Sequence, residues 1–207
     1  MAFDLDKLHA LWRADIEPSD ADLPTLADLR QHRVMFPVEA VQRHKRVLCL
    51  FCSLFCGRSD VIYIHDAKPQ TVTLVDLHAS GIAAMRRIYP PHWRYVCADY
   101  REFLAADESG GYDLVVADQP KALAHAAAID MLPLVARLCA PRWRLVVNYW
   151  DTAAATLGAE PTDRAALSEA LGQRTGLRTR FHEMLARGPD IHWAVIDVGP
   201  PESTPAP

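Results

Sequence analysis

The chain has 207 residues, of which 50% are hydrophobic and 23% are charged, and its formal net charge is −4. This length and balance indicate an ordinary soluble protein with one full hydrophobic core. The acidic balance gives no support to a nucleic-acid binder, unless the fold assembles a local basic patch, because phosphate contacts need a basic face. The absence of any run of about 18 apolar residues excludes a membrane-spanning helix.

The beginning of the chain and its cysteines indicate a cellular compartment. The first twenty residues contain five acidic side chains and no apolar block, so they do not form a secretory signal. Five cysteines, an odd number, indicate reduced thiols rather than a disulfide framework. We therefore expect a cytoplasmic protein.

The first part of the chain has a helical pattern. Apolar residues recur with helical spacing over residues 3–12, which predicts an amphipathic helix. Residues 19–35 predict a second helix, with Ser19 or Asp22 as its cap and Pro24 in its first turn.

Five short apolar runs then alternate with segments of helical period. This alternation predicts βαβ units, and therefore a mainly parallel sheet with helices on both faces. The expected strands are residues 46–51, 72–76, 94–99, 112–118 and 143–150, and the expected helices are 79–89, 100–106 and 121–139. Residues 58–67 are expected to form the first crossover helix, with Ser59 as its cap, although Val-Ile-Tyr-Ile within them favours a strand.

The end of the chain departs from this alternation. Residues 161–176 predict a helix with Thr162 as its N-cap. Two strand-like runs, residues 178–187 and 191–198, are joined by a turn short enough to force an antiparallel hairpin. Residues 199–207 form a proline-rich tail that is expected to be disordered.

Three of the expected strands end on an acidic residue: Asp76, Asp99 and Asp118. Ligands of open α/β sheets bind at the carboxyl ends of the strands. A carboxylate at the end of the second strand can accept hydrogen bonds from both hydroxyls of a ribose. Each acid alone could also cap the helix that follows it. Three acids in corresponding positions favour a ligand site.

The segments "RVLCLFC", "TVTLVD", "WRYVCADYREFL", "YDLVVADQP" and "RLVVNYW" follow one another and precede the hairpin. In this order and spacing the chain resembles the class I S-adenosylmethionine-dependent methyltransferases. The resemblance implies a three-layer α/β fold of the Rossmann-like methyltransferase type. Its seven-stranded, mostly parallel sheet would have an antiparallel final hairpin, with N-terminal helices before it. We expect a helical cap over residues 1–45, the methyltransferase domain over 46–198 and a disordered tail over 199–207.

The resemblance also implies a cofactor, S-adenosylmethionine (SAM), and roles for the residues at the strand ends. Asp76 would hold the ribose, and Leu77 would pack on the adenine. Asp99 would accept a hydrogen bond from the adenine amino group, with Tyr100 stacking beside it. Asp118 would face the methionine part of the cofactor and the substrate, where it would be the catalytic residue.

The loop after the first expected strand departs from the family, which usually has an acid followed by Gly-x-Gly there. Cys49 stands in place of the acid, and Phe51 and Phe55 stand among the loop positions. Glycines in such a loop let the backbone approach a ligand closely and take positive φ. The alternatives are a loop with another path, weak cofactor binding, or no binding. If the cofactor binds, we expect four residues of the loop to contact it: Phe51, Cys52, Ser53 and Gly57.

Three cysteines in this stretch, Cys49, Cys52 and Cys56, raise the alternative of a metal site. Their spacing is not that of the common zinc pairs, and it reverses the Cys-x3-Cys-x2-Cys order of radical enzymes that use the same cofactor. Cys49 also lies in a strand expected to be buried, where a free cysteine behaves as a small hydrophobic residue. We expect no metal here.

The favoured function is an enzyme that transfers a methyl group from SAM to a small-molecule or unidentified acceptor. The Pro-Pro-Tyr of amino-methylating nucleic-acid enzymes is absent after Asp118. A metal-assisted O-methyltransferase would need oxygen ligands, for which Asp118, Asn148 and Asp151 are candidates. The simpler interpretation is that the last two residues shape the loop after the fifth strand.

Two alternatives stay open. A non-catalytic relative with the same fold would serve as a binding or scaffold subunit for a protein partner, and the phenylalanines of the loop favour it. An NAD-linked oxidoreductase would also use Asp76, but the Gly-x-Gly-x-x-Gly turn that it needs is missing.

Overall fold

The structure is a computed structural model of the whole chain. The residues that it describes are 4–14, 16–31, 35–52, 60–119, 129–187 and 190–200. Several expectations fall wholly or partly outside these ranges: the loop residues up to Ser59 with its cap role, the first part of the helix expected over residues 121–139, the turn at residues 188–189 and the tail from residue 201 onward. Gly199, expected to begin the tail, is instead the last residue of a strand. Among the described residues, no helix has the length and apolar character that crossing a bilayer requires.

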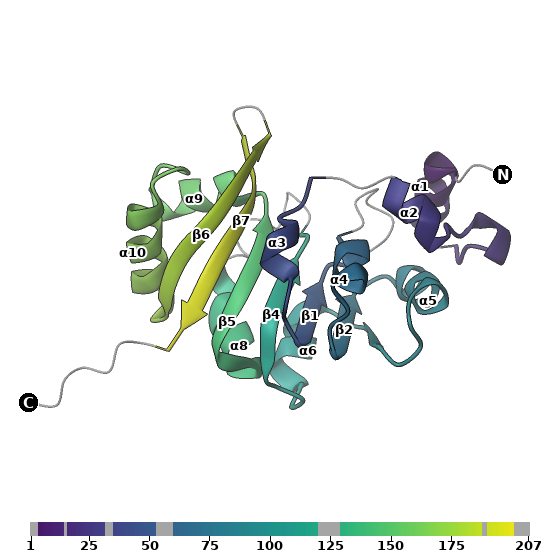
Figure 1. Cartoon of the computed structure of the whole chain (residues 1–207), viewed down its shortest axis with the longest axis horizontal. Helices are drawn as coiled ribbons and strands as arrows, with labels where there is room; N and C mark the ends of the chain where they lie inside the picture. Colours follow the sequence, from purple (N-terminus) through teal and green to yellow (C-terminus); the bar gives the residue numbers. More distant parts are fainter. Residues whose placement is uncertain are drawn as a thin grey trace, which may run out of the picture.

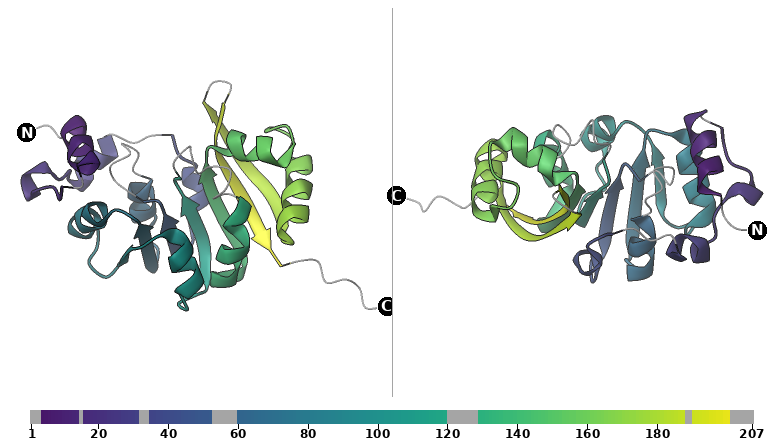
Figure 2. Two further views of the ribbon diagram at one scale, coloured as in Figure 1. Left: turned by 180° about the vertical axis from the view of Figure 1, so that it is seen from behind. Right: turned by 90° about the horizontal axis from the view of Figure 1, so that it is seen from above.

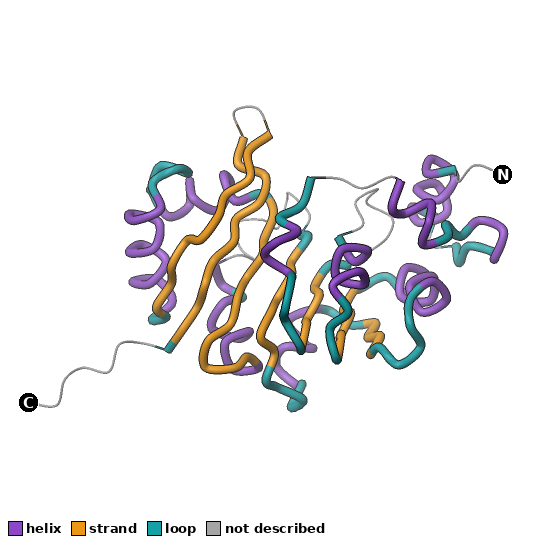
Figure 3. The backbone as a smooth tube through the Cα atoms, viewed as in Figure 1, coloured by secondary structure: helices purple, strands orange, loops and turns teal. Residues whose placement is uncertain are grey.

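Seven strands in the described chain form one mixed sheet (Figures 1 and 3). They are β1 (Arg46–Leu50), β2 (Thr71–Asp76), β3 (Arg94–Cys97), β4 (Tyr112–Ala117), β5 (Cys139–Asn148), β6 (Arg178–Arg187) and β7 (Asp190–Gly199). Their order across the sheet is β3-β2-β1-β4-β5-β7-β6. The strands β1 to β5 are mutually parallel, whereas β7 runs antiparallel to both β5 and β6. The predicted mostly parallel sheet with an antiparallel final hairpin is confirmed.

Helices cover both faces of this sheet, which gives three layers (Figure 2). One face carries α6 (Tyr100–Ala106), α8 (Leu132–Leu138), α9 (Trp150–Leu157) and α10 (Arg164–Thr175). The other carries α3 (Val38–Val41), α4 (Val61–Ala67) and α5 (Ala79–Ile88), with α1 (Leu5–Arg13) and α2 (Leu26–Gln31) joining the same layer. Each layer buries its own hydrophobic cluster against the sheet.

The alternation of side chains along β1 divides its residues between the two clusters. Leu48 and Leu50 belong to the cluster beneath α6 and α8, whereas Val47 and Cys49 belong to the cluster beneath α4. Because both faces are covered, the strand is a continuous apolar run, as the sequence predicted. The helix expected over residues 58–67 is also confirmed as α4, although its residues are β-branched and aromatic. All of Val61–Ile64 are buried there, so packing outweighs strand propensity.

The helix expected over residues 19–35 is two separate elements. Asp22 Oδ2 accepts hydrogen bonds from the backbone and hydroxyl of Ser19, at 3.1 and 2.6 Å, and closes a short 3₁₀ turn over Asp20–Asp22. α2 begins only at Leu26, where the Thr25 backbone donates to Asp28 Oδ2 at 2.8 Å. Pro24 therefore lies between the two elements rather than in a first helical turn.

Two further differences concern the segments around β5 and α10. The strand expected over residues 143–150 starts earlier and ends at Asn148, and Trp150 is already the first residue of α9. The break is at Tyr149, whose φ of 50° is left-handed. The N-cap of α10 is Asp163 rather than Thr162, because the Asp163 carboxylate accepts from the N–H groups of Ala165 and Ala166 at 3.1 and 3.0 Å.

Candidate functional site

The strand order reverses at the neighbours β1 and β4, so the crevice outside their carboxyl ends is the expected place for a ligand. Backbone hydrogen bonds continue past the strand ends and keep these ends level. Phe51 N–H donates to Val75 O at 3.0 Å, and Asp118 N–H donates to Leu50 O at 3.3 Å. The segments after β1 and β4 therefore start side by side at one edge of the sheet.

Asp76, the last residue of β2, is buried to all but 7% of its surface. Its Oδ1 accepts a hydrogen bond from the backbone N–H of His78 at 2.9 Å, which fixes the direction of the carboxylate. Leu77, the next residue, is 65% exposed, so it presents an apolar side chain to solvent at the edge where a ligand would bind. A buried acid beside an exposed leucine is an arrangement that can hold a polar and an apolar part of one ligand.

Asp99 and Tyr100 lie after β3, where α6 begins. Asp99 caps this helix, because its Oδ1 accepts from the N–H of Arg101 at 2.8 Å. The sequence left open that each strand-end acid caps the following helix, and Asp99 does so through one oxygen of its carboxylate. The Tyr100 hydroxyl accepts a hydrogen bond from Arg101 Nε at 3.0 Å.

Phe51 meets Tyr100 from the other side of this edge. The two ring centroids are 4.9 Å apart, with an angle of 55° between the ring planes. The φ of Phe51 is 60°, a left-handed conformation that costs a residue with a β-carbon about 1 kcal/mol or more. Phe51 therefore adopts the backbone conformation that glycine usually supplies, while its half-buried ring packs toward α6.

Asp118 and Gln119, which follow β4, are buried and tied to the end of β5. The Asn148 side-chain nitrogen donates to Asp118 Oδ1 and, at 3.1 Å, to the backbone oxygen of Gln119. The Asn148 side-chain oxygen accepts from the backbone N–H of Gln119 at 2.9 Å. Both the oxygen and the nitrogen of the Asn148 amide therefore hydrogen-bond to the two residues that follow β4. This geometry disfavours Asn148 as a Mg²⁺ ligand, because its oxygen already has a donor.

Cys49 and Cys52 lie against the helical layer formed by α4. Burial raises the pKa of both thiols, and nearby carboxylates raise it further: Asp60 for both, with Asp118 for Cys49 and Asp76 for Cys52. The thiols therefore stay protonated at neutral pH, and Cys52 Sγ donates to Val75 O at 3.6 Å. Among the residues that the structure describes, no three metal-binding side chains come together. Ser53, Phe55, Cys56 and Gly57 lie outside these residues.

Asp60 is a residue of this region that the sequence did not single out. It lies directly before α4 and is only 2% exposed, and within the described chain its Oδ2 has no hydrogen-bond partner. Burial raises its pKa to about 7, although backbone N–H groups of Asp60 and Val61 act in the opposite direction. The only feature of the sequence that could have indicated a buried acid is the position of Asp60 directly before the apolar run Val61–Ile64. An aspartate in that position also fits an ordinary helix cap.

Several solved methyltransferases are similar to the chain in structure. The O-methyltransferase TomG from Streptomyces achromogenes, solved in complex with SAM, has a TM-score of 0.56 at 12% identity, over 94% of this chain and 89% of that one. The O-methyltransferase from Bacillus cereus, in complex with S-adenosylhomocysteine (SAH), has a TM-score of 0.56 at 9% identity, over 95% and 100%. Cofactor-bound Rv0187 from MTB has a TM-score of 0.55 at 17% identity, over 93% and 88%.

No protein-family model matches the chain, and no curated protein matches it in sequence. At such low identities the structural likeness concerns the fold. The fold is that of the class I SAM-dependent methyltransferases, with the strand order and reversed seventh strand described above. The resemblance seen in the sequence is thereby confirmed at the level of the fold.

Proposed function

We propose that the protein is a SAM-dependent methyltransferase that acts on a small-molecule acceptor. The observation that carries this proposal is the set of three acids, Asp76, Asp99 and Asp118, at or just after the carboxyl ends of β2, β3 and β4 in a methyltransferase sheet. An acid in each of these positions suits a cofactor with a ribose, an adenine amino group and a charged methionine part. Solved structures with the same fold hold SAM or SAH.

The proposed cofactor roles follow the positions of the side chains. The Asp76 carboxylate would accept from the ribose hydroxyls, and Leu77 would pack on the adenine. Asp99 would accept from the adenine amino group beside the Tyr100 ring. The backbone at Phe51 and Cys52, and that of Ser53 and Gly57 beyond them, would border the methionine part.

The proposed catalytic residue is Asp118. A bound cofactor supplies a methyl group already activated by its sulfonium, so the protein has mainly to align the acceptor. The proton that an acceptor hydroxyl or amine loses would pass to the Asp118 carboxylate, which Asn148 holds in a fixed direction. Asn148 would thus be a positioning residue.

One observation favours the second candidate, a non-catalytic binding subunit with this fold. The Phe51 ring rests on Tyr100, at the place where the proposal needs room beside the adenine. If that contact persists with ligand present, the cofactor site is closed and the fold serves a protein partner instead.

Calorimetric titration with SAH, with NAD in parallel, tests the proposal. We expect SAH to bind one-to-one with a micromolar dissociation constant, and NAD not to bind. Asp76→Asn keeps an oxygen for the His78 N–H but loses the charge. The variant should therefore bind SAH roughly 10- to 100-fold more weakly, as expected for a hydrogen bond to a charged group.

The control is Asp130→Asn, which makes the same change at an exposed residue before α8. It should bind SAH as the parent does. Failure of the parent to bind SAH would reject the methyltransferase proposal in favour of the binding subunit. Equal affinities of Asp76→Asn and the parent would remove the ribose role of Asp76 alone.

A further inference from the structure

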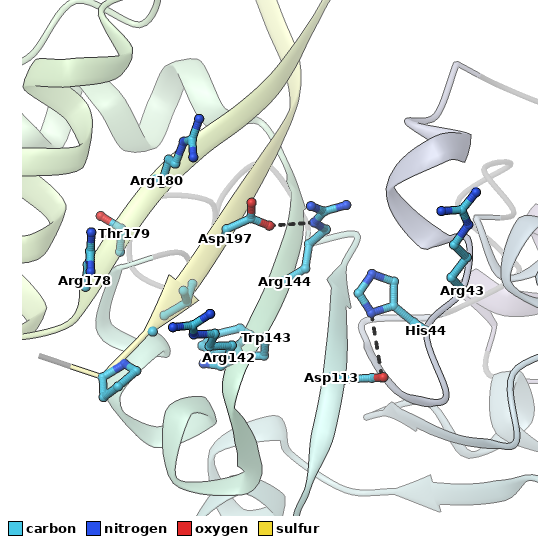
Figure 4. Close-up of a pocket in the computed structure, with 13 residues that line it drawn as sticks. Arg43, His44, Asp113, Arg142, Trp143, Arg144, Arg178, Thr179, Arg180 and Asp197 are labelled. Carbon is cyan, nitrogen blue, oxygen red and sulfur yellow. Dashed lines mark hydrogen bonds and ion pairs between the residues drawn. The ribbon is translucent and has the colours of Figure 1, made fainter.

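A groove of about 1000 Å³ is lined by residues of the sheet and of the segment before β1 (Figure 4). It lies toward the opposite end of the sheet from the strand-end acids. It is formed by Asp113 of β4, residues 142–144 of β5 and 178–180 of β6, the last residues of β7, and the segment before β1. Five arginines are among its lining residues: Arg43, Arg142, Arg144, Arg178 and Arg180. This basic groove, as we call it, is present in a chain whose net charge is −4.

Strand register brings these arginines to one face. In the sheet, Arg144 of β5 and Arg180 of β6 both pair with Asp197 of β7, so the three side chains form a row across the strands. Two residues along each strand, Arg142 and Arg178 project in the same direction, because side chains alternate between faces. Their neighbours that point the other way pack in the cluster beneath α9 and α10: Trp143, Phe181, Ile196 and Val198.

Arg142 and Arg178 form a second row, and the position between them has no side chain. Gly199 pairs with Arg178 on one side and faces the Arg142 position on the other. A β-carbon added to Gly199 would meet no atom nearer than the backbone oxygen of Pro141 at 4.0 Å. The hollow between the arginines is therefore open at Gly199.

The acids of the groove are already engaged. Asp197 Oδ1 accepts from Arg144 Nε at 2.7 Å, and Asp113 accepts from the backbone N–H groups of Lys45 and Arg46, each at 2.9 Å. Burial lowers the pKa of His44, so this ring is neutral at pH 7. Five arginines against two aspartates leave three net positive charges around the groove.

We propose that the basic groove binds a compact anion with two or more phosphate groups. Neighbouring strands lie about 4.8 Å apart and alternate residues about 7 Å apart, so the four arginines of β5 and β6 mark a rectangle of roughly 10 by 7 Å. The planar guanidinium matches the oxygens of a phosphate and binds them through paired hydrogen bonds. A di- or triphosphate chain spans this rectangle with one phosphate toward each row.

A compact oligophosphate fits the groove better than a nucleic acid does. A long polyanion would meet the acidic remainder of the surface, whereas a short one meets only the local positive charge. Among the described residues that line the groove, Trp143 is only 5% exposed, and the His44 side chain is only 19% exposed. Bases of a single strand would thus lack the exposed ring on which they stack.

The test is calorimetric titration with tripolyphosphate in a phosphate-free buffer at low salt. The first variant carries Arg142→Gln and Arg180→Gln. Both arginines are exposed, and each belongs to a different row. The control carries Arg86→Gln and Arg174→Gln, which make the same charge change at exposed residues of α5 and α10. We expect the first variant to bind at least about tenfold more weakly than the parent, and the control to stay within about twofold.

A second variant, Gly199→Leu, keeps every charge and fills the centre of the hollow. We expect it to weaken tripolyphosphate binding about as much as the loss of the two arginines, with an unchanged circular dichroism spectrum. Any of these results would overturn the proposal: no binding by the parent at millimolar ligand, equal weakening by the control, or full binding by Gly199→Leu. Binding of a 20-nucleotide single strand without binding of tripolyphosphate would overturn it in favour of a nucleic acid. Loss of SAH binding in Asp76→Asn bears on none of these outcomes, because the two sites lie at opposite ends of the sheet.

Discussion

Phe51 combines a glycine-like backbone with a large side chain at the edge of the proposed cofactor site. Its left-handed φ of 60° opposes folding, whereas the contact of its ring with Tyr100 favours it. The two contributions can be separated, since Ala removes the ring alone and Gly removes both the ring and the steric conflict of the β-carbon.

We expect Phe51→Gly to be more stable than Phe51→Ala by about 1 kcal/mol, because only glycine takes positive φ without strain. Urea unfolding monitored by circular dichroism measures the difference. If the ring also crowds the cofactor, both variants should bind SAH more tightly than the parent does.

The matched control is Leu77, which is exposed and lies outside the left-handed region. At this position alanine should be the more stabilising residue, as it usually is, with Leu77→Ala more stable than Leu77→Gly by about 0.5–1 kcal/mol. The same order at both positions would show that the backbone at Phe51 relaxes and stores no strain.

For single residues, the sequence predicted where the site residues lie along the strands better than it predicted which groups they contact. Asp76 and Asp118 could be found because buried apolar runs end on or directly before them. Asp99 could be found because it follows the short apolar run of β3, a strand that is only partly buried. The role of the Asn148 amide could not be found, since its hydrogen bonds to the residues after β4 depend on the pairing of β4 with β5, and Asn148 lies 30 residues from Asp118. The burial of Asp60 was equally hidden, because it depends on how α4 packs on the sheet.

At the scale of elements, the first turn of α10 offers a direct test of capping. Asp163 accepts from two backbone N–H groups, whereas Thr162, the cap expected from the sequence, precedes it by one residue. We expect Asp163→Ala to reduce the free energy of unfolding by about 1 kcal/mol, and Thr162→Ala to change it by less than about 0.5 kcal/mol. Urea unfolding of both variants checks this. A larger loss at Thr162 would place the start of the helix one residue earlier.

Strands were the most predictable elements, and their ends the least. A strand covered on both faces is apolar along most of its length, so β1, β2 and β4 stand out in the sequence. The end of β5 does not, because Tyr149 and Trp150 continue the apolar run. The left-handed turn at Tyr149 ends the strand, and a tyrosine gives no sign of such a turn.

At the scale of the whole molecule, the sheet carries two distinct edges. The carboxyl ends of its parallel strands bring together acids, whereas the amino ends of β5 and β6 bring together arginines. Neither grouping shows in the net charge of −4, since the arginines of the basic groove come from segments more than 30 residues apart. Strand order and register, rather than composition, decide where this charge gathers.

The burial of Asp60 beside the hydrophobic cluster beneath α4 makes the stability of the whole molecule depend on pH. Asp60 borders this cluster with a pKa raised to about 7 by burial, from an ordinary value of 3.8. Between these two values the folded protein keeps a proton that the unfolded chain releases. The free energy of unfolding therefore falls as pH rises from about 4 to about 7, and the loss is complete above pH 7.

We expect Asp60→Asn to abolish this fall, because the amide has the same shape and does not ionise. At pH 8 the variant should be more stable than the parent by an amount on the order of 4 kcal/mol, whereas at pH 4 the two should be close. Urea unfolding at several values of pH measures the difference, and Asp130→Asn, an exposed acid, should follow the parent throughout. A variant that is less stable than the parent at pH 8 would show that the Asp60 carboxylate is ionised and has a partner in the folded protein.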